Sequence, residues 1–281
     1  MTESIFLADG ALFVPTEHAR GPWDPHALHG GAPAALIASA FERMEPGGEL
    51  PFARLSFEFL RPVPMAPLKL TTRISRPGRR VQALAAELES GGITVCRASA
   101  LRLVAAPEEL PALALAQVQT AQASAIAGPE QGRDVHFTLE EVEHKSFAST
   151  AMEMRFLEGA PLSGELPELD TPSKHVPSGA AKVWMRLRYP LLPEEPLTPL
   201  ARVAATADFG NGVATVLPFE RYLFINADLT IHLQRQPRGE WIGIDARTLL
   251  DADGTGLAES VLHDIHGPVG RAFQTLVVEP R

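Results

Sequence analysis

The segment Ala53-Arg54-Leu55-Ser56-Phe57 has a counterpart 174 residues further along the chain, Ala227-Asp228-Leu229-Thr230-Ile231. With this shift, residues 53–104 align with residues 227–278 without a gap, and many apolar, small and arginine positions coincide. A repeat of this length indicates a duplicated domain rather than a solenoid. Two like domains can bury their apolar faces by pairing as a pseudo-two-fold dimer within one chain.

The first copy has the pattern of one buried helix followed by several strands. The helix is predicted over residues 32–44, where small and aliphatic residues follow two glycines and a proline lies in the first turn. It is apolar on almost every side and should therefore be buried. Strands are predicted at residues 5–14, 53–61, 67–76, 81–89 and 93–104. The predicted fold class is α+β, with an antiparallel sheet wrapped around the helix.

The second copy is predicted to repeat this plan. The same shift places its buried helix on residues 206–218, and strand-like segments occur at 147–157 and 181–189. Residues 105–140 are rich in Ala, Pro, Glu and Gln, which is typical of a linker. The predicted organisation is an N-terminal domain at 1–106, a linker at 107–140 and a C-terminal domain at 141–281.

Composition argues against several classes of protein. The chain has 281 residues, 45% of them hydrophobic, and its formal net charge of -9 argues against a nucleic-acid binder. The single cysteine, Cys96, permits neither an intrachain disulfide nor a cysteine-based zinc site. His232, His263 and His266 lack the spacing of a metal site. The N-terminus lacks a basic signal-peptide region, and no apolar run approaches the roughly 18 to 20 residues of a membrane span. We expect a cytoplasmic protein, and its association into homo-oligomers is left open.

Comparison of the two copies singles out three polar side chains of the second copy. Asp208, Thr230 and Gln274 fall on Ala34, Ser56 and Ala100 of the first copy. Asp208 is predicted in the first turn of the second helix, Thr230 in the next strand and Gln274 in the last strand. All three could then converge at one end of the helix. A carboxylate can take a proton from water as a general base, while a hydroxyl and an amide hold the water oxygen in line.

Each of these three residues also has a structural interpretation, which the sequence leaves open. Asp208 can complement the helix dipole, Thr230 can be an ordinary strand residue, and Gln274 can bond to a strand edge. Their joint absence from the first copy favours the functional interpretation.

The start of the first helix and a group of arginines are further candidates for ligand contact. Glycines in His29-Gly30-Gly31 let a phosphate or thioester approach the backbone, or let the helix pack closely against the other domain. His29 is a conceivable base for which the sequence offers no partner. Arg73, Arg76, Arg79 and Arg80 could contact the phosphates of a carrier such as coenzyme A, or form a solvated turn.

Known nucleophile and nucleotide motifs do not occur in the chain. There is no Gly-x-Ser-x-Gly motif, no P-loop, and no Gly-x-Gly-x-x-Gly after a predicted strand. Serine hydrolase, NTPase and dinucleotide-binding functions therefore lack support.

Three segments together resemble the acyl-CoA thioesterase II family. They are His29-Gly30-Gly31-Ala32-Pro33-Ala34-Ala35-Leu36, Phe57-Glu58-Phe59-Leu60-Arg61-Pro62 and Val269-Gly270-Arg271-Ala272-Phe273-Gln274-Thr275-Leu276. The resemblance spans nearly the whole chain outside residues 105–140. It implies a double hotdog fold, in which two sheets each wrap around a long helix within one chain. It also implies an acyl-CoA substrate, no metal or cofactor, no covalent intermediate, and water activation by Asp208, Thr230 and Gln274.

The expected function is therefore hydrolysis of an acyl-CoA to a free acid and CoA, within fatty acid metabolism. Asp208 would be the base, Thr230 and Gln274 would position the water, and Gly30 and Gly31 would bind substrate. Amides at the N-terminus of the second helix would polarise the thioester carbonyl.

Two other functions on the same fold stay open. Enoyl-CoA hydratases of this fold use an Asp followed five residues later by a His. In this chain the residue five positions after Asp208 is Val213. A non-catalytic protein that binds acyl thioesters or lipids would keep the fold without activity. The departure from the best-known family members at His29 and Pro33 leaves the acyl-chain preference open.

Overall fold

The computed structural model describes residues 3–44, 50–105, 111, 125–135, 145–159, 179–219 and 221–281. In the first half of the chain one helix, α1 (Gly31–Arg43), is followed by four long strands. The strands of this half are β1 (Phe6–Asp9), β2 (Leu12–Pro15), β3 (Phe52–Phe59), β4 (Leu68–Arg76), β5 (Val81–Ser90) and β6 (Ile93–Leu103). The helix and strands predicted for this half are confirmed.

The second half repeats the four long strands and contributes two helices, α3 (Pro199–Ala207) and α4 (Gly210–Val213). Its strands are β7 (Arg133–Val135), β8 (Met152–Glu158), β9 (Ala180–Leu187), β10 (Tyr222–Asn226), β11 (Asp228–Leu233), β12 (Ile242–Leu250), β13 (Thr255–Asp264) and β14 (Gly267–Pro280). One-turn helices lie at Glu17–Ala19, Pro129–Gln131 and Phe147–Ala151. The last of these replaces the first residues of a predicted strand, because Ser146 and Ser149 form a reciprocal cap that starts a helical turn.

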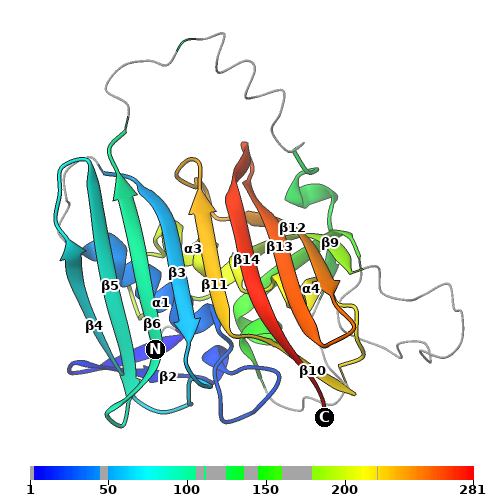
Figure 1. Ribbon diagram of the computed structural model, residues 1–281, viewed down its shortest axis with the longest axis horizontal. Helices are drawn as coiled ribbons and strands as arrows, with labels where there is room; N and C mark the ends of the chain where they lie inside the picture. Colours follow the sequence, from blue (N-terminus) through cyan, green and yellow to red (C-terminus); the bar gives the residue numbers. More distant parts are fainter. Residues whose placement is uncertain are drawn as a thin grey trace, which may run out of the picture.

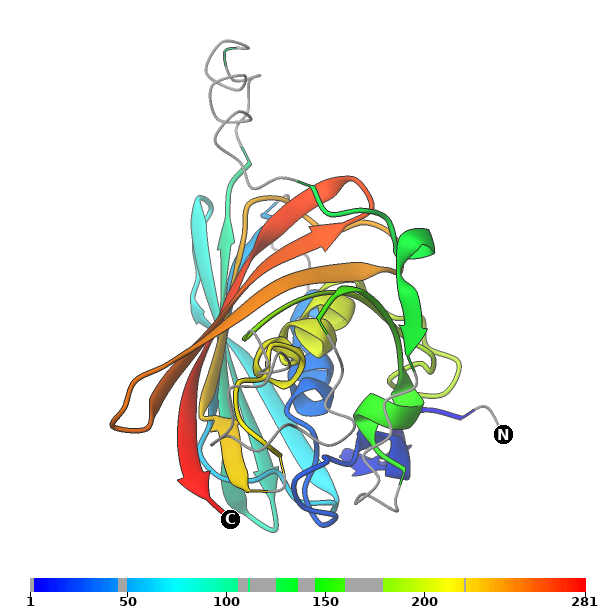
Figure 2. The same cartoon turned by 90° about the vertical axis from the view of Figure 1, so that its right-hand side faces the viewer.

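The described strands form one antiparallel sheet of 14 strands. Its order is β1-β2-β4-β5-β6-β3-β11-β14-β13-β12-β9-β8-β7, with β10 paired to β14. Figure 1 shows the central strands side by side with α1 and α3 behind them, and Figure 2 shows the sheet curling around these helices. The two half-sheets join where β3 pairs with β11. The prediction of an antiparallel sheet wrapped around helices is confirmed.

The 174-residue repeat is reproduced by the strands. Residues 68–76 of β4 correspond to residues 242–250, the span of β12, and residues 81–90 of β5 correspond to residues 255–264, the span of β13. Strands β6 and β14 begin at the equivalent residues Ile93 and Gly267. The duplication inferred from the sequence therefore holds across the sheet.

The position predicted for the second helix is wrong. Helix α3 covers Pro199–Ala207 rather than residues 206–218, so Asp208 follows its C-terminus instead of lying in its first turn. Two start signals outside the repeat explain the difference: the Thr198 side chain accepts the Ala201 N–H, and Pro199 occupies the first turn. The connection from helix to central strand is longer in this half, residues 208–227 against 44–51, so the gapless shift does not extend to the helix.

Helices α1 and α3 pack side by side in opposite directions. Near the C-terminus of α1, the Glu42 carboxylate accepts the Leu200 N–H at the start of α3 at 3.2 Å. At the other end of the pair, Gly31 packs against α3 so closely that an added Cβ would lie 2.7 Å from the Ala205 carbonyl oxygen. The N-terminus of α1 therefore lies beside the C-terminus of α3.

Most of the linker predicted at 107–140 lies outside the described residues. In its described part, β7 extends the second half-sheet by pairing with β8, and the Trp184 indole donates to the Ala127 carbonyl at 2.6 Å. The boundaries of the linker and of the two domains stay a prediction. None of the described helices has the length and hydrophobicity that crossing a bilayer requires.

Candidate active site

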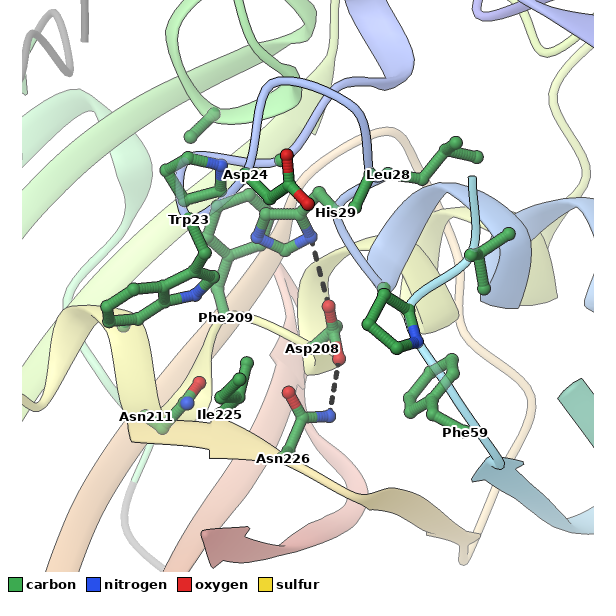
Figure 3. Close-up of a pocket in the computed structure, with 18 of the residues that line it drawn as sticks. Trp23, Asp24, Leu28, His29, Phe59, Asp208, Phe209, Asn211, Ile225 and Asn226 are labelled. Carbon is green, nitrogen blue, oxygen red and sulfur yellow. Dashed lines mark hydrogen bonds and ion pairs between the residues drawn. The ribbon is translucent and has the colours of Figure 1, made fainter. Parts of the chain in front are cut away.

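A pocket of about 340 Å³ lies where α1 begins and α3 ends. Most of its wall is apolar, and this part includes Trp23, Leu28, Phe59, Val63, Phe209 and Val213. Three polar side chains, those of His29, Asp208 and Asn226, meet at one side, as Figure 3 shows. A largely apolar pocket with a few convergent polar groups has the character of a small-molecule site.

Asp208 is at the centre of this polar group. Its carboxylate Oδ2 lies 3.0 Å from Nδ1 of His29, and its Oδ1 accepts a hydrogen bond of 2.9 Å from the Asn226 amide (Figure 3). Only 3% of the residue is exposed to solvent. Burying a carboxylate is costly unless it is hydrogen bonded, so these partners are needed to hold an acidic residue here.

Gln274 connects the break between α3 and α4. Its Nε2 donates to the Asp208 carbonyl oxygen at 3.1 Å, and its Oε1 accepts the Asn211 N–H at 3.1 Å. Nε2 also lies 3.5 Å from Asp208 Oδ1. Helix ends leave backbone groups without intrahelical partners, and the Gln274 side chain acts as such a partner at the end of α3 and at the start of α4. The structure thus brings Gln274 to Asp208, mainly through the Asp208 backbone.

Thr230 lies on β11 and is not among the residues that line the pocket. Its hydroxyl is 3.0 Å from that of Ser56, across the pairing of β3 with β11. No hydrogen bond among the described residues connects Thr230 to Asp208. The polar side chain that contacts the carboxylate in its place is Asn226, at the junction of β10 and β11.

Sequence reasoning missed Asn226 and found no partner for His29. The same 174-residue shift that singled out Asp208 places Asn226 on Phe52, a polar residue against an apolar one. It also places His29 on Val203. The contrast was therefore visible in the sequence at both positions, although the structure shows that the shift does not hold at His29; the partner of His29 comes from the other half of the chain, and only folding reveals it.

The two glycines at the start of α1 have different surroundings. Gly30 lines the pocket, and a Cβ added to it would lie 2.8 Å from Oδ2 of Asp208. Gly31 packs against the Ala205 carbonyl, and its N–H donates to Nδ1 of His29 at 3.0 Å. Close helix packing therefore accounts for Gly31, while Gly30 lets the carboxylate approach the helix start.

The arginine cluster predicted from the sequence does not line this pocket. Arg73 and Arg76 lie on β4, and Arg79 and Arg80 occupy the turn to β5. The arginine that does line the pocket is Arg61, an exposed residue shortly after β3.

Cys96 is not suited to act as a nucleophile near this site. Burial, together with the negative charges of Glu58 and Asp208, raises the pKa of its thiol to about 12. The thiolate is the reactive form of cysteine, so this side chain stays unreactive at neutral pH. Within the described residues, no cluster of three or more His, Cys, Asp or Glu side chains could hold a metal ion.

Comparison with known families identifies the chain. Residues 19–103 match a family described as the acyl-CoA thioesterase N-terminal domain, and residues 127–278 match the acyl-CoA thioesterase C-terminal domain. The chain belongs to the acyl-CoA thioesterase family. The family resemblance noted in the sequence is confirmed.

Solved structures of proteins from other organisms share the fold of this acyl-CoA thioesterase family member. An acyl-CoA thioesterase II from Mycobacterium marinum has 16% identity and a TM-score of 0.61, with 100% of this chain and 95% of that chain covered. A hot dog fold protein of unknown function from Alicyclobacillus acidocaldarius has 16% identity and a TM-score of 0.69, with 98% and 95% covered. The predicted double hotdog fold is thereby confirmed. A search of curated proteins found no match.

Proposed function

We propose that the chain hydrolyses the thioester bond of an acyl-CoA in the pocket beside α1 and α3, releasing a free acid and CoA. The observation that carries the proposal is the buried Asp208 carboxylate at the polar side of an otherwise apolar pocket. The apolar walls suit an acyl chain, because burying methylene groups is favourable by about 0.8 kcal/mol each. The polar side chains of the pocket then lie next to the thioester carbon and a water molecule.

In this proposal Asp208 supplies the negative charge on which water activation depends. Gln274 acts as a positioning residue, because its amide holds the backbone of Asp208 and the start of α4 together. Water positioning by Thr230 stays a prediction, since its hydroxyl is bonded to Ser56.

Asp208 follows the C-terminus of α3, so the long helix whose N-terminus lies at this site is α1. The N–H of Ala32 donates to the His29 carbonyl oxygen, and the N–H of Gly31 points at Nδ1 of His29. We therefore assign the polarisation of the thioester carbonyl to the main chain of Gly30, which lines the pocket at the positive end of α1.

The nucleotide end of CoA carries phosphates and needs local positive charge on a chain whose net charge is -9. Arg61 is exposed on the pocket wall. Arg281 lies over the rings of Trp23 and Phe219, at 5.4 and 4.2 Å from their centres. We propose that Arg61 receives a phosphate of CoA, while the cytoplasm and fatty acid metabolism remain the predicted setting of the reaction.

The test is thiol release from a panel of acyl-CoAs by the wild-type protein and by Asp208→Asn. This variant should lower kcat by about 10²- to 10⁴-fold and leave acyl-CoA binding largely intact. The matched control is Asp24→Asn, because Asp24 lines the same pocket but is solvent-exposed and contacts the backbone of His26. Near-complete activity of Asp208→Asn would contradict the assignment.

The same assay separates the two alternatives. Acyl-CoA binding by the wild type without thiol release would favour a binding protein. Loss of the enoyl double bond without thiol release would favour a hydratase. The residue five positions after Asp208 is Val213, which lines the pocket and offers no proton, so hydrolysis is the function that the site supports best.

A further inference from the structure

The side chain of His29 is placed to exchange protons with a molecule bound in the pocket. Its side chain is 12% exposed, against 2% for that of Asp208, and its ring lines the pocket wall. The ring stacks on Phe209 at 4.3 Å between centroids and lies 5.2 Å from the ring of Phe147. These contacts fix the plane of the imidazole and leave its edges to make polar contacts.

Two groups compete for Nδ1 of His29. The carboxylate Oδ2 of Asp208 lies 3.0 Å from Nδ1 and can only accept a hydrogen bond. The backbone nitrogen of Gly31 also lies 3.0 Å from Nδ1 and can only donate one. A charge-assisted bond is about twice as strong as a neutral one, so the tautomer with the proton on Nδ1 is favoured. That tautomer leaves Nε2 with a lone pair, and the Gly31 N–H then no longer donates to Nδ1. No hydrogen bond among the described residues involves Nε2.

The oxygens of Asp208 are already occupied. Oδ2 faces His29, and Oδ1 accepts from Asn226 and lies near Gln274. A carboxylate held in this way orients an imidazole and stabilises its protonated form, and it has little access to a water molecule of its own.

We propose that His29 is the catalytic residue that carries the proton in thioester hydrolysis, with Asp208 as the group that orients it. This inference rests on the proposed function. Water attacks the thioester carbon, the new C–O bond forms, and the water proton passes to Nε2 of His29. The tetrahedral intermediate then collapses, the C–S bond breaks with its electron pair on sulfur, and the proton passes from Nε2 to that sulfur. The products are the free acid and the thiol, and His29 regains its starting form.

The arrangement draws its two members from different halves of the chain. His29 precedes α1 in the first copy, and Asp208 follows α3 in the second. Gly30 permits the approach, because any Cβ there would meet the carboxylate at 2.8 Å. The pair therefore exists only in the folded chain with both halves in place.

The experiment measures thiol release by the wild type, His29→Ala, His29→Gln, Asp208→Asn and the double variant His29→Gln with Asp208→Asn. Each single variant should lower kcat by about 10²- to 10⁴-fold. The double variant should be no slower than the slower single variant, because residues that act as a unit are not additive. Added imidazole should restore part of the activity of His29→Ala and none of that of Asp208→Asn. The control is His26→Gln on the same loop, an exposed histidine, which should keep wild-type activity.

Other results would overturn the inference. They are activity of His29→Gln close to the wild type, multiplication of the two single losses in the double variant, or failure of imidazole to restore His29→Ala while that variant still binds acyl-CoA. If His29→Ala does not bind acyl-CoA, the double-variant comparison with His29→Gln decides the question. A wild type that releases no thiol from any acyl-CoA would overturn the proposed function, and this inference with it.

Discussion

Ser56 and Thr230 face each other across the pairing of β3 with β11, with their hydroxyl oxygens 3.0 Å apart. They are also equivalent residues of the 174-residue repeat. In an antiparallel pair of equivalent strands, a residue lies opposite its own counterpart only on the two-fold axis. This pair therefore marks the pseudo-two-fold axis of the molecule.

The place of Thr230 on this axis leads to a prediction for its variants. Thr230→Val should destabilise the protein by about 1 kcal/mol, the typical value of a hydrogen bond, without a comparable loss of kcat. Ser56→Ala is the matched control and should behave in the same way. Urea unfolding and thiol release measure the two quantities. If Thr230→Val alone abolishes turnover, the hydroxyl has the water-positioning role expected from the sequence.

Gly30→Ala should impair catalysis more than stability. The added Cβ would lie 2.8 Å from Oδ2 of Asp208 and would displace the carboxylate from His29. Misplacement of a catalytic group by about 1 Å can lower kcat about 10²-fold. The control is Gly212→Ala in the same pocket, where an added Cβ meets nothing within 4 Å. Steady-state kinetics and melting temperatures compare the two, and equal kinetic effects would contradict the prediction.

Arg61→Gln should raise KM for an acyl-CoA by about two- to fivefold, because an exposed ion pair contributes about 0.2–1 kcal/mol. Its kcat should stay unchanged. The effect should vanish with an acyl thioester of N-acetylcysteamine, which has no phosphate, and should shrink in high salt. Arg79→Gln, in the turn after β4, is the control and should leave KM unchanged. A higher KM for Arg79→Gln and an unchanged KM for Arg61→Gln would instead favour phosphate binding by the arginine cluster predicted from the sequence.

His263 should make the protein sensitive to acid. It is 1% exposed, neither ring nitrogen has a hydrogen-bond partner among the described residues, and burial lowers the pKa of the imidazole from 6.5 to about 4. As pH falls below 6.5 the unfolded chain takes up a proton before the folded chain does. The free energy of unfolding should therefore decrease between pH 6.5 and 4, by about 3 kcal/mol from this residue.

Urea unfolding between pH 7 and pH 4 measures this effect. His263→Leu should be less sensitive to pH over this range, whereas His266→Gln, an exposed control, should follow the wild type. Parallel pH dependence of His263→Leu and the wild type would show that other groups cause the acid sensitivity.

The sheet was predictable from the sequence because its strands carry the repeat. Residue alternation and turn residues located β3 to β6, and the shift of 174 residues located the equivalent strands β11 to β14 in the second copy. The second helix was not predictable from the same shift. Its start is set by Thr198 and Pro199, which lie outside the aligned segment.

The candidate site was predictable in part. Gln274 lies in an aligned strand and differs from its counterpart Ala100, whereas Asp208 was found by a shift that does not hold in the helix region; the structure nevertheless brings the two residues together. Asn226 lies just before the aligned strand, where the repeat was not compared, and His29 acquires its partner only through the packing of α1 on α3. Contacts between the two halves have no signature in either half alone.

The antiparallel helix pair has a second end, where Glu42 accepts the first N–H groups of α3. In an assembly of two identical single-domain chains, both ends would have to be the same, and every substitution would occur twice. Fusion of the copies removes that constraint. One end of this pair fastens the helices together, and the other combines an imidazole from one copy with a carboxylate from the other. Under the proposed function, each chain would therefore have one active site, although it contains two hotdog units.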